Sequence, residues 1–413
     1  MRVLYVVGAC LSKNTSANMS HNGYVQGLLE NDCQVEILMA ADSWGQTDNL
    51  LPRWKNAKYY CYPSETTHDR LRKYIGRNVL RPTVLAANSY VQTREPQKAA
   101  SLKVAVREYL KKAYYFLFPI DPKYPLEKQW LKNASKFRTN IEYDLVISNS
   151  SPAASHKLVA ILSHSGHLKY KRWIQIWEDP WYYDLYGGHK AEILDEESAL
   201  LNVATEVFYV SPLTLVYQQR YFEESANKMK QIPLPYLAFA SESEQSYEEI
   251  SYAYLGDYYS HVRNLVPFYQ ALCQMKSPGY IYGDSDIALG QTAQIEISGR
   301  VTLDKLATVQ ENTTVLVHLC NLHGGQIPGK IYHYSATAKP ILFILDGTPE
   351  EKKYIREYFE RFNRYYFCDN DTQSILSAMN QIEADIADGR KWNPVTEFSP
   401  KAVVRQLLGS CCK

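Results

Sequence analysis

Gly324-Gly325-Gln326-Ile327-Pro328-Gly329-Lys330-Ile331-Tyr332-His333-Tyr334 stands between two apolar runs, 315–319 and 340–345, that have the pattern of buried strands. Pro328 suits the first turn of a helix, which then opens with Gly329 and Lys330. Unpaired N–H groups and the positive dipole end at such a helix start attract phosphate. The stretch therefore predicts a strand–loop–helix–strand unit, with its anion site where an open α/β sheet binds ligands.

The length and composition predict a globular protein of two domains. The chain has 413 residues, of which 46% are hydrophobic and 22% charged, and its formal net charge is only +1. This length exceeds one ordinary core, and the charge balance gives no reason to expect a nucleic-acid partner. The eight cysteines include no CxxC pair, which fits reduced thiols in a cytosolic protein. Residues 1–8 read as a strand rather than a signal peptide, and no apolar run approaches a transmembrane helix, so we expect a cytoplasmic location.

Strand patterns alternate with helix patterns along both halves of the chain. The expected strands are residues 3–7, 34–39, 143–148, 173–177 and 207–211, then 252–256, 280–283, 295–299, 315–319 and 340–345. The expected helices are 19–30, 153–163, 185–202, 264–275, 303–311, 350–363, 372–388 and 400–408. This alternation predicts two doubly wound parallel-sheet domains that face each other across a cleft, at 1–235 and 236–390. We expect residues 391–413 to pack back on the first domain.

Residues 98–138 form a basic region that is expected to be helical. It holds ten Lys and Arg against three acidic residues, a net charge of +7. One interpretation is a face that meets anionic lipid or a lipid-linked substrate, so that the protein lies on the inner face of the plasma membrane. The other is an ordinary solvated helix surface. The sequence does not separate these two.

Five stretches together resemble the GT-B glycosyltransferases, and in particular the retaining family 4 type of bacterial surface-polysaccharide pathways. In the family's order they are 143–156 (similar to DxIxSSSPPxSxH), Trp173 with 179–181 (W…DPW), 254–256 with 263–264 (the phosphate loop), 297–301 (fxGxV) and 328–340 (PxKxFEYxAxGKP). The resemblance covers most of the chain. It implies a GT-B fold, with two Rossmann-like domains that face a central cleft.

The resemblance also implies an activity, which is transfer of a sugar from a UDP- or GDP-sugar to a saccharide or lipid-linked acceptor, with no cofactor and no essential metal. It places catalytic roles on His156, Asp179, Arg263 and Lys330. Donor and phosphate binding falls to Gly256, Arg263, Gly325, Pro328, Gly329, Lys330 and His333, with Arg300 and Val301 at the nucleotide edge. The acceptor side comprises Gly8, Ser151, His156 and Asp179.

One departure from the family pattern makes other functions worth considering for this chain. His333 stands where the family has the acidic residue that holds the donor ribose, and Ala338 replaces the glycine of GKP. A histidine lacks the bidentate acceptor of a carboxylate. Nucleotide recognition is then either rearranged or lost, and loss would make the chain a non-catalytic binding or scaffold subunit. A third alternative is a GT-B nucleotide-sugar epimerase, for which the first domain offers only Asp179 and His156.

Several of these residues also have ordinary structural interpretations. Lys330 would then be a surface lysine, His156 would cap or pack its helix, and Asp179 would start an Asp-Pro turn. Two further motifs favour no function. Asp284-Ser285-Asp286 resembles a metal-binding D-x-D but follows a strand as a polar turn, and 324–330 reads GxxxxGK without the Ser or Thr that a nucleotide-binding P-loop needs.

Overall fold

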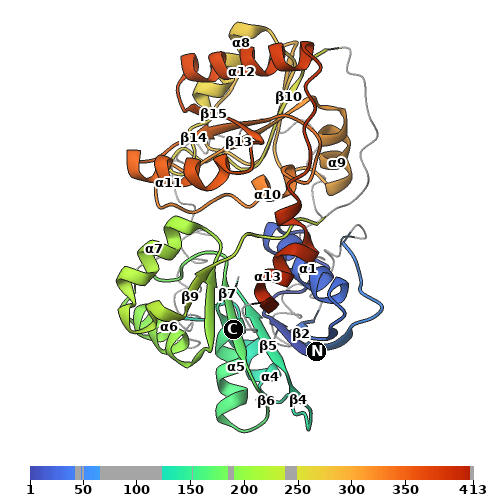
Figure 1. Cartoon of the computed structure of the whole chain (residues 1–413), viewed down its shortest axis with the longest axis vertical. Helices are drawn as coiled ribbons and strands as arrows, with labels where there is room; N and C mark the ends of the chain where they lie inside the picture. Colours follow the sequence, from blue (N-terminus) through green and yellow to red (C-terminus); the bar gives the residue numbers. More distant parts are fainter. Residues whose placement is uncertain are drawn as a thin grey trace, which may run out of the picture.

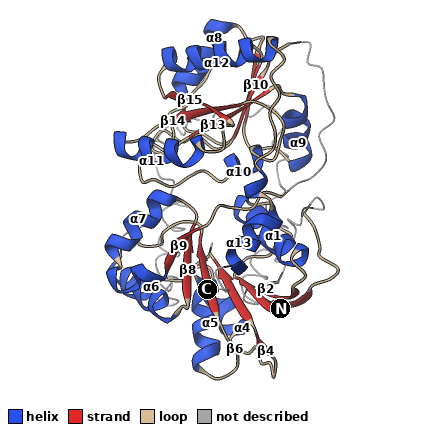
Figure 2. Ribbon diagram, viewed as in Figure 1, coloured by secondary structure: helices blue, strands red, loops and turns tan. Residues whose placement is uncertain are grey.

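The computed structural model describes residues 1–41, 48, 51–65, 123–150, 152–184, 190–237 and 249–409. Two parallel sheets dominate this part of the chain, and each has helices on both faces (Figures 1 and 2). Residues 98–122 of the basic region lie outside the described residues, and so does Ser151. The expected boundary at residue 235 stays a prediction, because 238–248 lie outside them too.

The first sheet has seven strands in the order β3-β2-β1-β5-β7-β8-β9. They are β1 (Arg2–Val7), β2 (Gln34–Ala40), β3 (Lys58–Tyr62), β5 (Leu145–Asn149), β7 (Trp173–Trp177), β8 (Glu206–Tyr209) and β9 (Met229–Gln231), while β4 (Glu142–Tyr143) pairs with β6 (Lys169–Tyr170). Its helices are α1 (Ser16–Glu30), α4 (Lys128–Ala134), α5 (Ala154–His164), α6 (Ala191–Val203), α7 (Pro212–Tyr221) and the 3-10 helix η1 (Glu223–Lys228). The central strands are buried on both faces, as helix-covered parallel strands require.

The second sheet has six strands in the order β12-β11-β10-β13-β14-β15. They are β10 (Tyr252–Leu255), β11 (Gly279–Tyr282), β12 (Ile295–Ser298), β13 (Val315–Leu319), β14 (Ile341–Leu345) and β15 (Tyr365–Asp369). The accompanying helices are α8 (Val266–Met275), α9 (Leu303–Asn312), α10 (Lys330–Tyr334), α11 (Pro349–Glu360), α12 (Thr372–Ala387), the 3-10 helix η2 (Thr396–Phe398) and α13 (Pro400–Gly409). The expected pair of doubly wound sheets is therefore confirmed.

Four strands escaped prediction. Three of them, β3, β9 and β15, lie at the edges of the two main sheets, and the fourth, β6, pairs with β4. In β3 every residue is at least partly exposed, as expected of a strand at the sheet edge. The helix expected at 185–202 begins at Ala191 in the described residues. The helix of the opening motif has only five residues and starts at Lys330, one residue later than expected, with Pro328 before it.

The last helix returns to the first domain. In Figure 1, α13 lies beside α1, and Asn31 Nδ2 donates a hydrogen bond to Lys401 O at 3.0 Å. Gly27 makes this packing possible, because a Cβ there would overlap the carbonyl of Pro400. One cluster of buried apolar side chains continues from the first sheet through α13 into the second domain. Among the described residues, no helix combines the length and apolar character needed to cross a bilayer.

Candidate functional site

Arg263 anchors the edge of the second domain that faces the first. It lies in the loop between β10 and α8, where its Nε donates to Asn321 Oδ1 at 2.8 Å and its Nη1 to Asp257 O at 2.9 Å. The ends of β10 and β11 lie so close together beside it that a Cβ on Gly283 would overlap the carbonyl of Gly256. Backbone groups from two strands therefore line the same small area as the guanidinium.

Lys330 lies in the same area and is half-buried. Burial lowers its pKa to about 8, with Asp257 acting in the opposite direction. Arg263 and Arg300 lower this pKa further, because a third positive charge is unfavourable near two others. Three cations with the two nearby carboxylates of Asp257 and Asp284 leave an excess of one positive charge at the ends of parallel strands. This is the electrostatic environment that a diphosphate would relieve.

Arg300 completes the cationic group from the loop after β12. Its guanidinium is largely exposed and forms an ion pair with Asp257, with Asp284 Oδ2 at 3.4 Å. Burial works against charge on Asp257, but Arg300 holds the pKa of this carboxyl below its usual value. The neighbouring Val301 is half-buried against the main core. The Arg300 guanidinium is therefore exposed to solvent on one side and held by Asp257 on the other.

The glycine-rich loop before α10 connects this cationic group to the first domain. Gly324 and Gly325 both have positive φ, at 94° and 69°, which other residues adopt only at a cost. Gly325 packs against Leu213 of α7, and its carbonyl accepts a hydrogen bond from Ser211 Oγ. Gly329 lies close to Leu234. The loop thus crosses from one domain to the other at residues 324–329.

Gln326 makes the main polar contact across the domains. Its Nε2 donates to Asp179 Oδ1 at 2.8 Å and to Asp184 Oδ2 at 3.1 Å. Asp179 touches solvent, yet protein from both domains surrounds it, and this burial raises its pKa to about 6, with the charge of Asp184 adding to the effect. Gln326 and Arg263 act in the opposite direction. Asp179 therefore lies on the first domain, near the Arg263 guanidinium of the second.

A buried glutamate holds the Asp179 segment in place. Glu197 of α6 accepts hydrogen bonds from the backbone N–H groups of Trp181, at 3.2 Å, and Tyr182, at 2.7 Å. Glu197 is fully buried, and burial raises its pKa to about 7 despite these two bonds. Glu197 of α6 thereby holds the backbone of the turn after β7 in place.

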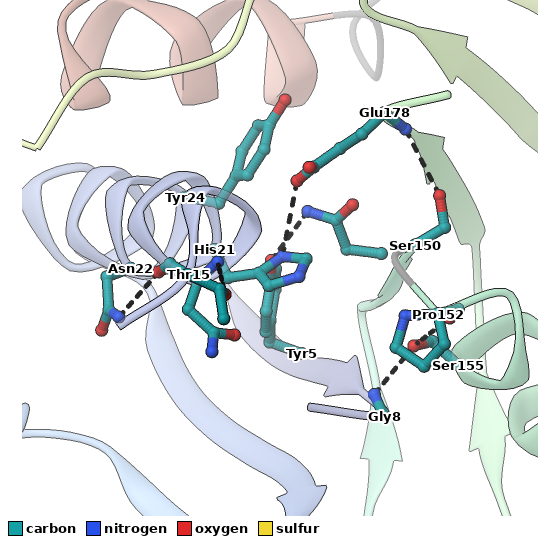
Figure 3. A network of polar contacts seen from close by, with 12 residues as sticks. Tyr5, Gly8, Thr15, His21, Asn22, Tyr24, Ser150, Pro152, Ser155 and Glu178 are labelled. Carbon is teal, nitrogen blue, oxygen red and sulfur yellow. Dashed lines mark hydrogen bonds and ion pairs between the residues drawn. The ribbon is translucent and has the colours of Figure 1, made fainter. Parts of the chain in front are cut away.

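A second polar network links β1 and α1 to Glu178, the residue before Asp179 (Figure 3). His21 of α1 points toward Glu178, with Nδ1 3.7 Å from Oε1, and the same nitrogen lies 3.1 Å from Tyr5 Oη. Asn149 donates to Tyr5 Oη at 2.9 Å. Burial raises the pKa of Glu178 well above its usual value, and Asp179 raises it further. The loop after β7 therefore holds two adjacent carboxyl groups that resist ionisation.

His156 does not take the expected place at the acceptor side. Its side chain is fully buried, stacks on Trp177 with ring centroids 4.2 Å apart, and contacts Ser148 Oγ through Nδ1 at 2.7 Å. Burial lowers its pKa to about 3, so the ring is neutral. This is the geometry of a packing residue, which cannot touch a sugar. Gly8, by contrast, lines an open cavity of about 440 Å³ with Pro152.

His333 also differs from the expectation of donor contact. Its Nδ1 accepts a hydrogen bond from the backbone N–H of Leu237 at 3.3 Å, where the chain leaves the first domain. Burial lowers its pKa to about 4, with the charge of Lys330 adding to this, so the ring is a neutral acceptor. A carboxylate could accept the same bond. The imidazole is thus used to hold the backbone at Leu237. Its Nε2 has no hydrogen-bond partner within the described residues.

The D-x-D motif is engaged in local contacts. Asp286 accepts hydrogen bonds from Ser260 N at 2.6 Å and Ser260 Oγ at 2.7 Å, while Asp284 lies beside Arg300. This agrees with the expected polar turn. Over the described ranges, no cluster of three or more His, Cys, Asp or Glu side chains could hold a metal ion.

Sequence reasoning missed four residues of this site. Asp184, Gln326, Asp257 and Glu178 were not singled out. Two of them had a signal, because Gln326 lies inside the glycine-rich motif and Glu178 directly precedes Asp179. Asp184 and Asp257 had none, since a single aspartate in a loop is ordinary in any sequence.

Comparison with solved structures decides the fold. Sucrose-phosphate synthase from Thermosynechococcus elongatus matches with a TM-score of 0.54 and 12% identity, over 99% of this chain and 100% of that one. HepE from Anabaena, solved in complex with UDP-glucose, matches with a TM-score of 0.52 and 12% identity, over 99% and 95%. The chain has the GT-B fold. No family model and no curated protein matches the sequence.

The GT-B assignment confirms the fold expected from the five sequence stretches. In these terms, the second domain carries Arg263, Lys330 and Arg300 at its interdomain edge, and the first carries Asp179 opposite them. Both groups come from loops at the carboxyl ends of parallel strands, which is where open α/β sheets bind ligands.

Proposed function

We propose that this GT-B protein transfers a sugar from a nucleotide-diphosphate donor, UDP- or GDP-linked, to a saccharide acceptor. One observation carries the proposal, which is the convergence of Lys330, Arg263 and Arg300 at the interdomain edge of the second sheet. A group of cations with a lowered lysine pKa is stabilised by an anion of charge −2 or more. The UDP-glucose complex of HepE belongs to a protein of the same fold and is consistent with this donor class.

The chemistry assigns a role to each side of the interface. Cleavage of the C–O bond between the sugar and the diphosphate leaves negative charge on the leaving phosphate and positive character on the sugar. Lys330 and Arg263 would stabilise the leaving group without a metal ion, as fixed cations do. Asp179 would accept a hydrogen bond from the acceptor hydroxyl. Retention of configuration and membership of family 4 rest on the sequence resemblance alone.

The test is a thermal-shift screen of the full chain against UDP, GDP, CDP, dTDP and ADP. A ligand that binds only the folded state adds about 2.7 kcal/mol of stability at one hundred times Kd. We expect a clear shift with one nucleotide, its loss in Lys330→Ala and its partial return in Lys330→Arg. Lys353→Ala serves as the matched control, since Lys353 is an exposed lysine on α11.

The absence of a shift with every nucleotide would contradict a donor site and favour the non-catalytic alternative. The residue at position 333 supports this non-catalytic alternative. His333 replaces the family's acidic residue, and its imidazole is used to hold the interdomain chain at Leu237. A GT-B binding or scaffold subunit would need the fold and this connection, but no turnover. Detection of any sugar transfer would exclude it.

The acceptor and the location are proposed from the sequence. The net charge of +7 over residues 98–138 favours contact with anionic lipid. A lipid-linked oligosaccharide in surface-polysaccharide synthesis, at the inner face of the plasma membrane, would combine this contact with the site between the domains. The protein would then be cytoplasmic and peripheral to the membrane.

A further inference from the structure

We infer that Glu351 of α11 is a positioning residue for the donor-phosphate site. Its carboxylate holds the start of the glycine-rich loop, and this loop leads to Lys330 and contacts the asparagine that orients Arg263. The inference rests on the proposed function. It adds to that function a residue that lies outside the five stretches that resemble the family.

The Glu351 carboxylate connects two loops at the carboxyl ends of neighbouring strands. Its Oε1 accepts a hydrogen bond from Gly324 N at 2.7 Å, in the loop after β13, and its Oε2 accepts one from Thr348 N at 2.8 Å, in the loop after β14. Glu351 is only 5% exposed, and no lysine, arginine or histidine in the described part of the chain forms an ion pair with it. The two backbone N–H groups and the N-terminus of α11 therefore stabilise this carboxylate.

Glycines make room for the carboxylate in both loops. Gly347 has a φ of 105°, and a Cβ there would lie 2.5 Å from Glu351 Oε2. Gly324, whose N–H binds the other oxygen, has a φ of 94°. Other residues rarely adopt these conformations. The backbone of each loop is thus shaped to bring an N–H group to Glu351, which favours a fixed geometry over a chance contact.

The capping box of α11 explains only one of the two bonds. In this box the N–H of Glu351 donates to Thr348 Oγ1 at 3.2 Å, while the Glu351 side chain accepts from Thr348 N. A capping box needs nothing from Gly324, which lies 27 positions earlier in the chain. The bond to Gly324 therefore stabilises the glycine-rich loop rather than the helix.

The glycine-rich loop is connected in turn to the cationic group. Asn321 Nδ2 donates to the carbonyl of Gln326 at 3.4 Å, and Asn321 Oδ1 accepts from Arg263 Nε at 2.8 Å. The loop ends at Lys330, where α10 begins. Loss of the bond at Gly324 would therefore change how Arg263 and Lys330 face a diphosphate.

The experiment is isothermal titration calorimetry of UDP and of GDP into the full chain and its variants. Glu351→Gln keeps the length of the side chain but replaces one acceptor oxygen by an NH2 group that faces a backbone N–H. We expect the dissociation constant of the nucleotide to rise about tenfold, which corresponds to one hydrogen bond to a charged group. Glu351→Asp keeps a carboxylate but is one methylene too short to bind both loops, and it should weaken the nucleotide by a similar factor. This second variant tests the inference if Glu351→Gln does not fold.

Two further substitutions separate the position of the loop from the stability of α11. Thr348→Ala removes the hydroxyl of the capping box and leaves the bond between Glu351 and Gly324, so we expect a lower melting temperature with an unchanged nucleotide affinity. Glu350→Gln removes an exposed carboxylate from the same helical turn and should leave the affinity unchanged. Amide hydrogen exchange at Gly324 should become faster in Glu351→Gln and stay the same in Thr348→Ala.

Two results overturn the inference. In one, the folded Glu351→Gln variant, or Glu351→Asp in its place, binds the nucleotide as tightly as the wild type. In the other, Thr348→Ala weakens the nucleotide as much as the Glu351 variants do, which would reduce Glu351 to a helix cap. A wild-type chain that binds neither UDP nor GDP would instead overturn the proposed donor site, and the inference with it.

Discussion

At the scale of single residues, burial decides which of the candidate groups are charged. Lys330 loses basicity in its half-buried position among cations, while Asp179 and Glu197 lose acidity between the domains and inside the first domain. His156 and His333 are both neutral. A sequence names these ionisable groups, but their protonation depends on neighbours that are remote in the chain, such as Glu197 behind Trp181.

Glu197 leads to a prediction about stability and pH. Its folded pKa of about 7 exceeds the unfolded value of about 4.3, so the folded state binds the extra proton between these values. Its contribution to stability therefore falls as pH rises from about 4 to 7, by about 4 kcal/mol at most. In Glu197→Gln the melting temperature should depend less on pH over this window. Glu192→Gln, exposed on the same helix, is the control, and parallel curves for wild type and Glu197→Gln would contradict the prediction.

At the scale of elements, the loop 324–329 joins the two halves of the site. Its sequence predicts an anion site, from the glycines and Lys330, and this site stays a prediction. Its actual path is set by contacts with the other domain. Gly325 fits against Leu213, its carbonyl binds Ser211, and Gln326 reaches Asp179. The α10 helix that follows has only five residues, so its dipole is short.

Gly325 is predicted to control closure of the domains. Gly325→Ala adds the cost of a positive φ, about 1–2 kcal/mol, and also places a Cβ 2.7 Å from Leu213 Cδ2. We expect a larger radius of gyration in small-angle X-ray scattering and a lower melting temperature. Gly166→Ala is a matched control, because Gly166 has the same φ of 69° with nothing within 4 Å. Equal effects of the two substitutions would show that Gly325 has no role in closure.

At the scale of the whole molecule, the domains are joined by apolar packing as well as by the polar loop. The main core cluster passes through both domains, and α13 fixes the end of the second domain to α1 of the first. Gln231 at the edge of the first sheet donates to Tyr358 of α11 at 3.0 Å. The domains therefore meet in two places. Near α13 they are joined by apolar packing, and near α7 they are joined by the glycine-rich loop.

Membrane association belongs to this scale as well. Reversal of Lys103, Arg107, Lys111 and Lys112 to Glu should abolish binding to vesicles that contain phosphatidylserine, because each basic residue near the surface contributes about 1 kcal/mol. Co-sedimentation of the protein with these vesicles, at low and at high salt, measures the binding. The control reverses four exposed lysines of the second domain and the last helix, Lys305, Lys353, Lys391 and Lys401. Unchanged partitioning of the first variant, or equal loss in the control, would contradict a specific membrane face.

The sequence by itself determined the two parallel sheets, the main strands and the position of the cationic group, because buried strands and glycine-rich loops leave local patterns. It did not reveal the edge strands β3, β9 and β15, most of whose residues are at least partly exposed. Only the tertiary structure buried His156, turned His333 to Leu237 and brought Gln326 to Asp179 and Asp184. The contacts of His333 and Gln326 join residues about 100 to 150 positions apart, and folding alone decides which distant side chains share one environment.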